Sequence, residues 1–82
     1  MDIVMIKKQG CQPCSQFEPD ARRIAEENEV GFKTVMRESM PEEMQPEFYP
    51  YFYLMHEGKA IEHWGGTSDR KYERVIQRHL KK

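Results

Sequence analysis

The only two cysteines of the 82-residue chain are the residues whose type and spacing can do chemistry. Cys11 and Cys14 enclose Gln-Pro, so they lie three positions apart. On a helix this spacing places both sulfurs on one face, one turn apart and within the span of a disulfide. A disulfide here would close a very short loop and hardly constrain the unfolded chain. We therefore interpret the pair as chemical rather than structural.

The chemistry that such a pair supports is thiol–disulfide exchange, in which a thiolate attacks a disulfide. If Cys11 begins a helix, the unpaired N–H groups and the positive end of the helix dipole favour its anion. Lys7 and Lys8 add positive charge nearby, although the sequence does not give their directions. Pro13 suits a first turn, where no helical N–H bond is lost. We predict that Cys11 attacks and that Cys14 resolves the mixed disulfide.

Zinc binding is the main alternative use of the two thiols, with histidines as the remaining ligands. The histidines of the chain are His56, His63 and His79. Six residues separate the first two, which exceeds the usual spacing in zinc fingers, and there is no second cysteine pair. We therefore predict no metal site.

The elements that position the dithiol follow from the spacing of apolar residues. The run over 2–7 is apolar and β-branched, which predicts a buried strand directly before the cysteines. After them, apolar residues recur at helical spacing as far as Asn28. This apolar face consists of Phe17, Ala21, Ile24 and Ala25. Residues 32–36 then predict a second strand, which completes a βαβ unit with a right-handed crossover.

The second half of the chain predicts a short helix, a hairpin and a last helix. Residues 39–42 carry a capping serine with a glutamate three positions later, which indicates the start of a short helix. Strands over 51–56 and 59–64 are joined by Glu57-Gly58, a typical hairpin turn. Thr67 or Ser68 then caps a helix with one apolar face. That face consists of Tyr72, Val75, Ile76 and Leu80.

This order of elements predicts an α/β fold with one domain over residues 1–82. The four strands form a mixed sheet, and helices flank it on both faces. Aromatic residues crowd the segment 48–53, and packing within a sheet covered on both faces explains most of them. Base stacking on these rings would need an accompanying basic groove, and none is apparent. Tyr49 is the aromatic residue that we expect to reach a partner.

Over essentially the whole chain, these residues resemble the thioredoxin superfamily in a minimal form of its fold. Cys-Gln-Pro-Cys is similar to the Cys-Gly-Pro-Cys of thioredoxins, whereas glutaredoxins carry Cys-Pro-Tyr-Cys. Pro19, five positions after the second cysteine, matches the proline inside the active-site helix of thioredoxins. Pro50, Gly58 and Gly66 follow one another at intervals of eight, as in thioredoxins. The resemblance implies a cis peptide bond before Pro50, opposite the dithiol.

The resemblance also implies a substrate groove, and it has three departures. The backbone of Tyr49 and the loop at Gly65 and Gly66 would line the groove. The chain starts on the strand before the dithiol, as glutaredoxins do. Gly10 replaces a tryptophan, and Met5 replaces a buried aspartate that accepts the proton of the resolving thiol. That proton must therefore pass to water or to another group.

A glutaredoxin-like role has support of its own. The segment from Gly65 to Asp69 is similar to the one with which glutaredoxins hold glutathione. A helix N-terminus with Thr67 and Ser68 can bind a carboxylate such as the γ-glutamyl group. Ordinary helix capping explains the same residues. The length of the hairpin favours the thioredoxin side.

The composition agrees with a soluble domain: 38% of residues are apolar, 33% are charged, and the net charge is −1. This charge gives no general attraction to nucleic acid or to an anionic membrane. No apolar run approaches the roughly 18 residues of a membrane span, and no signal peptide precedes the first strand. We therefore expect a cytoplasmic monomer.

We expect a thiol–disulfide oxidoreductase with no bound cofactor other than its own Cys11–Cys14 disulfide. Its substrates would be proteins that contain disulfides, and the resemblance includes ribonucleotide reductase among them. Electrons would come from a flavoprotein similar to thioredoxin reductase, or from glutathione. A redox-inactive binding module is the alternative from another class, and the presence of both cysteines argues against it.

Overall fold

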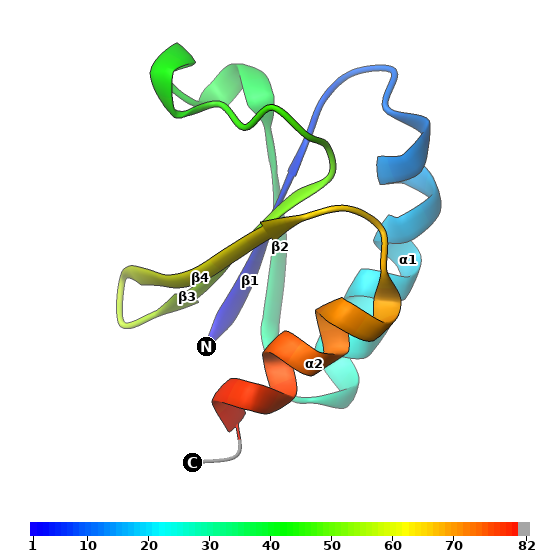
Figure 1. The fold of residues 1–82 in the computed structure, drawn as a ribbon, viewed down its shortest axis with the longest axis vertical. Coiled ribbons are helices and arrows are strands. Elements are labelled where there is room, and N and C mark those ends of the chain that lie inside the picture. Colours follow the sequence, from blue (N-terminus) through cyan, green and yellow to red (C-terminus); the bar gives the residue numbers. More distant parts are fainter. Residues whose placement is uncertain (81–82) are drawn as a thin grey trace.

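Two helices pack on one face of a four-stranded mixed sheet in the computed structural model, which describes residues 1–80 (Figure 1). The elements in chain order are β1 (Asp2–Lys7), α1 (Gln12–Glu27), β2 (Gly31–Met36), β3 (Tyr51–His56), β4 (Lys59–Gly65) and α2 (Asp69–Leu80). The strand order is β2-β1-β3-β4, with β1 parallel to β2 and the other pairs antiparallel. The predicted α/β fold with a mixed sheet is confirmed.

The central strand β1 divides the molecule into a helix side and an open side. Ile3 and Met5 point to the helix side, where they lie opposite Leu54 and Phe52 of β3. All four side chains are fully buried. Because side chains alternate along a strand, Val4 points to the other face. The hydrophobic core therefore lies between one face of the sheet and the two helices.

Aromatic contacts and one hydrogen bond join the two helices. The Phe17 ring of α1 meets the rings of Phe52 and Tyr72 edge to face, with centroids 5.8 and 5.7 Å away. The Tyr72 hydroxyl of α2 donates to the Ala21 carbonyl of α1 at 2.9 Å, and burial raises the pKa of this phenol. α1 continues through Pro19, which has no N–H to donate to the carbonyl one turn earlier.

The predicted short helix forms as 3₁₀ turns, whereas the expected helices on both faces of the sheet are not found in the described residues. Between β2 and β3 the chain forms two 3₁₀ turns, Arg37–Ser39 and Glu42–Met44, and neither has a side-chain cap. Pro41 precedes the second turn with extended backbone (φ −56°, ψ 143°), so Ser39 cannot cap it. Both α-helices of the described residues lie on one face of the sheet, and Tyr51 and Tyr53 are half-buried on the other face, where Ile6 is buried. Leu80 is also exposed, because α2 passes beyond the core at its last turn.

The topology brings three loops to one end of the sheet. β3 runs antiparallel to β1 and β4. The end of β1, the start of β3 and the end of β4 therefore lie at the same end of the sheet, as Figure 1 shows. The opposite end holds the predicted hairpin turn, which is confirmed: Glu57 and Gly58 have φ of 53° and 80°, as a type I′ turn requires.

Candidate active site

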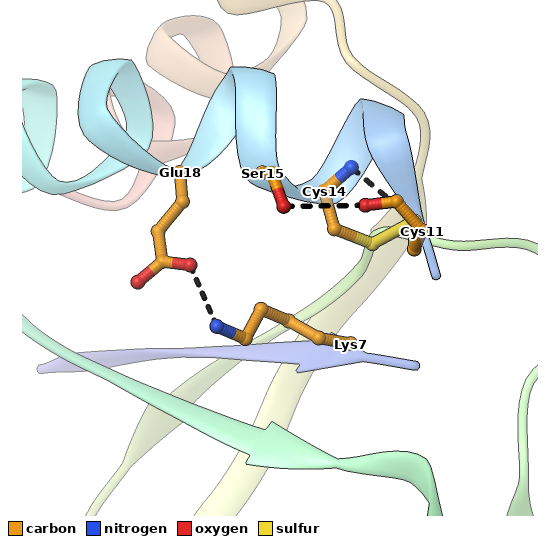
Figure 2. Close-up of a disulfide and its surroundings, with 5 residues drawn as sticks. All are labelled: Lys7, Cys11, Cys14, Ser15 and Glu18. Atoms are coloured by element: carbon orange, nitrogen blue, oxygen red, sulfur yellow. Dashed lines mark hydrogen bonds and ion pairs between the residues drawn. A yellow bond between two sulfur atoms is a disulfide. The ribbon is translucent and has the colours of Figure 1, made fainter. Parts of the chain in front are cut away.

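Cys11 is the N-cap residue of α1, and its sulfur performs the capping. The backbone of Cys11 is extended, and its Sγ accepts a hydrogen bond from the Cys14 N–H at 3.2 Å. The two cysteines form a disulfide with Cα atoms 5.3 Å apart (Figure 2). Cys11 is 8% exposed and Cys14 is 2% exposed. Cys11 is therefore the more exposed residue of the two.

The start of α1 suits a sulfur anion at Cys11. When the disulfide is reduced, the capping N–H and the positive end of the helix dipole favour the thiolate. The first turn contains no acidic residue to oppose that charge. Gln12 and Pro13 occupy the first two helical positions, where the proline has no helical N–H bond to lose. Both cysteines line a cavity of about 390 Å³.

Two lysines before the dithiol take different directions. The Lys7 ammonium binds Glu18 of α1, with 2.7 Å between Nζ and Oε1 (Figure 2). The hydrogen bond from Lys7 holds the pKa of the Glu18 carboxyl below its usual value, although partial burial opposes this, and Arg22 adds to the effect. Lys8 instead lies over the Tyr49 ring, 5.2 Å from its centroid. Sequence reasoning considered both lysines and missed Glu18, because the pair joins a strand to a helix across eleven positions.

At the buried position 5 of β1, on the helix side, Met5 offers no group that can accept a proton. Its side chain is fully buried and belongs to the same core cluster as Cys14. A thioether neither accepts a proton at neutral pH nor carries charge. The proton of the Cys14 thiol must therefore leave by another route.

The loop before β3 meets the loop after β4. The Tyr49–Pro50 peptide bond is cis, as the family resemblance implies. The Pro50 carbonyl accepts from the Gly66 N–H at 3.0 Å, which joins the two loops. Gly66 has φ of +112°, and a Cβ on Gly65 would lie 2.9 Å from the Tyr51 ring, so both positions favour glycine. Tyr49, Gly65 and Gly66 line one cavity of about 520 Å³, together with two neighbouring aromatic residues.

Tyr49 presents its backbone rather than its hydroxyl. Its ring packs on the hydrophobic core, and the buried hydroxyl has no hydrogen-bond partner in the structure. Within residues 1–80 the Tyr49 N–H and C=O bind no other backbone group. An extended peptide could therefore pair with them.

Thr67 lies apart from the glycine cavity. It faces Pro13 across another cavity of about 370 Å³, on the α1 side of the loop. The next residue, Ser68, caps α2: its hydroxyl accepts from the Lys71 N–H at 3.2 Å. The structure thus brings Tyr49, Gly65 and Gly66 together and places Thr67 in a separate hollow.

Each of the three histidines has a different polar neighbour. His63 hydrogen-bonds to Tyr51, His79 to Glu62, and His56 lies beside Glu57 at the hairpin turn. No group of three potential metal ligands occurs among residues 1–80. In the same part of the chain, neither helix has the length and apolar character needed to cross a bilayer.

Comparison with known proteins gives structural similarity without sequence matches. No family model and no curated protein matches the chain. Thioredoxin 1 of Thermosipho africanus superposes with a TM-score of 0.85 at 19% identity, over 99% of this chain and 96% of the other. Fasciola hepatica thioredoxin gives 0.81 at 27% identity over 94% and 78% of the two chains. Chlamydomonas reinhardtii thioredoxin f2 gives 0.84 at 19% identity over 98% and 79%.

These solved structures superpose on nearly the whole of this chain. The capping cysteine and its disulfide partner add the chemistry to that scaffold. The chain has the thioredoxin fold, and its dithiol supports a thioredoxin-like redox function.

Proposed function

We propose that this protein reduces disulfides of other proteins, with Cys11 as the nucleophile and Cys14 as the resolving thiol. The observation that carries the proposal is the position of the Cys11 sulfur at the start of α1, where it accepts the Cys14 N–H. Cys14 lies deeper, at 2% exposure, so a target disulfide meets Cys11 first. The order of attack follows from this difference in burial.

The reaction consists of two exchanges that balance. The Cys11 thiolate attacks one sulfur of the target disulfide, which breaks that bond and releases the other target sulfur as a thiolate. The Cys14 thiolate then attacks the Cys11 Sγ and releases the second target sulfur. The target gains two electrons and, with the two protons lost by the cysteines, ends as a dithiol. The protein ends with the Cys11–Cys14 disulfide.

The groove between the two loops is the proposed site for the target segment. The free backbone groups of Tyr49 can pair with an extended peptide, and Gly65 and Gly66 leave room beside it. A flavoprotein similar to thioredoxin reductase is the proposed electron donor in the cytoplasm. Glutathione is the second candidate, because Thr67 borders an open hollow next to Pro13.

Covalent trapping tests the proposed roles. A Cys14→Ser variant should accumulate a mixed disulfide with insulin, because the resolving thiol is gone. A Cys11→Ser variant should not. Gel electrophoresis without reductant reads out the adduct. The wild type should reduce insulin with thioredoxin reductase and NADPH. Turnover with glutathione alone, lost on Thr67→Val, would make it a glutaredoxin, and no turnover with either donor would indicate a binding module.

A further inference from the structure

The resolving cysteine lacks the support that the attacking cysteine has. The Cys11 sulfur accepts the capping N–H and lies at the positive end of the helix dipole, and both favour its thiolate. Cys14 sits inside the first turn at 2% exposure, and burial disfavours the thiolate that it must become. The buried residue of β1 beside this core, Met5, carries no charge. Another group must favour the Cys14 anion.

Lys7 is the charged residue of β1 that faces the dithiol. It lies two positions after Met5, hence on the same face of the strand. Its side chain is 25% exposed and lines the same cavity as Cys11 and Cys14. Glu18, four positions after Cys14 on the same face of α1, holds the Lys7 ammonium at 2.7 Å. Figure 2 shows the Lys7 side chain passing below the disulfide, between β1 and α1, with its ammonium directed to Glu18.

The charges around the cavity leave one unit of positive charge in this cluster. Arg22 binds the second oxygen of Glu18 at 3.2 Å, so one carboxylate lies between two cations. The hydrogen bond from Lys7 lowers the pKa of Glu18, which makes its carboxylate a weaker base and a poor acceptor for the Cys14 proton. From the other elements, β2 contributes the uncharged Met36, and the exposed Lys8 lies over Tyr49.

We propose that Lys7, positioned by Glu18, stabilises the Cys14 thiolate during resolution of the mixed disulfide. The Cys14 proton passes to water in the cavity, and the ammonium compensates the charge that remains on sulfur. Lys7 forms no bond in the reaction and keeps its own proton. This inference rests on the proposed function for the resolution step only.

Titration of Cys14 as the only thiol tests the proposal directly. The background is Cys11→Ser, since serine keeps a good N-cap. In that background, Lys7→Met should raise the apparent pKa of Cys14 by about one, which is about tenfold less thiolate at neutral pH. Lys7→Arg should keep the pKa near the starting value. Lys8→Met is the matched control, and it should have a smaller effect because its ammonium is exposed. Ultraviolet absorbance of the thiolate gives the titration.

The rate of resolution gives a second readout in the protein with both cysteines. Below both pKa values, Lys7→Met should slow resolution roughly threefold, because the loss of thiolate is partly offset by the greater nucleophilicity of a more basic sulfur. Above both pKa values, the same variant should be the faster one. Damage to the fold would slow resolution at every pH and would not produce this crossing.

Two outcomes would overturn the inference. One is an unchanged Cys14 pKa in Lys7→Met, and the other is an equal shift in Lys8→Met, which would indicate net charge alone. Failure of the wild type to reduce insulin would reject the proposed function instead. The Cys14 titration would still decide the role of Lys7, because it needs no protein substrate.

Discussion

The two helices begin with the same capping geometry and differ in what surrounds it. At α1 the Cys11 sulfur accepts the N–H of the residue three positions later, and at α2 the Ser68 hydroxyl does the same. Both hydrogen bonds measure 3.2 Å. Each cap satisfies one of the unpaired N–H groups that begin every helix.

The difference lies in burial and in nearby charge. Ser68 is exposed, and Asp69 in the first turn of α2 places a carboxylate at the positive end of the helix. Cys11 is buried, and the first turn of α1 has no acidic residue. The Asp69 carboxylate thus compensates the positive end of the α2 dipole. No carboxylate does so in the first turn of α1, so its dipole can stabilise a negative charge on the Cys11 sulfur. We therefore expect reactivity to follow from the uncompensated field of the helix rather than from the cap itself.

Placing a carboxylate in the first turn of α1 should remove most of this difference. Gln12→Glu puts a negative charge at the first helical position, beside the dithiol cavity. We expect the pKa of the Cys11 thiol to rise by about one, with about tenfold less thiolate at neutral pH. The free energy of unfolding should stay equal or increase, because the helix itself favours the charge. The pH dependence of alkylation by iodoacetamide measures the thiol pKa.

The control for this change is Gln16→Glu, one turn further along α1 and also exposed. It adds the same charge one turn inside the helix, away from the positive end of the helix dipole. Equal effects of the two substitutions on Cys11 would show that net charge, not the helix terminus, tunes the thiol.

Removing the cap of α2 should change stability and leave the thiols alone. Ser68→Ala loses the hydrogen bond from the Lys71 N–H, which costs about 1 kcal/mol of unfolding free energy. Urea unfolding measures the loss, and Ser68→Asp should restore the cap. A shift of the Cys11 pKa in Ser68→Ala would contradict the separation of the two helix starts.

Local patterns were enough to predict most of the fold and the dithiol. Helical spacing from Phe17 to Ala25, alternation in the strands and the positive φ demanded by Glu57-Gly58 are properties of neighbouring residues. The Lys7–Glu18 pair joins residues eleven positions apart on a strand and a helix, so only their packing creates it. Spacing in the sequence could not show it.

The open face of the sheet marks a second limit of sequence reasoning. Alternation correctly places Tyr51 and Tyr53 on one face, opposite the buried Phe52. It does not say what covers that face, because the cover comes from a segment distant from the strand. The segment 37–44 carries helix-start residues, yet Pro41 and its neighbours allow only two 3₁₀ turns.

The smallest effect that we expect concerns the contacts that hold the two helices, one neutral and one charged. α2 is joined to α1 through the neutral Tyr72 hydroxyl, whereas α1 is joined to β1 through the charged Glu18. The pKa of Glu18 is lowered from 4.5, so its stabilisation is fully present above that value and is lost as the pH falls through the folded-state pKa. Glu18→Gln should therefore cost about 0.5 kcal/mol near neutral pH and nothing in strong acid.

Urea unfolding across this pH range measures the difference between Glu18→Gln and the wild type. Glu26→Gln, an exposed position on the same helix, is the matched control and should leave the acid limb unchanged. A difference that stays constant with pH would mean that Glu18 contributes by packing and not by charge. Lys7 would then have no charged anchor, and the contrast between a helix held by charge and a helix held by a neutral hydroxyl would fail.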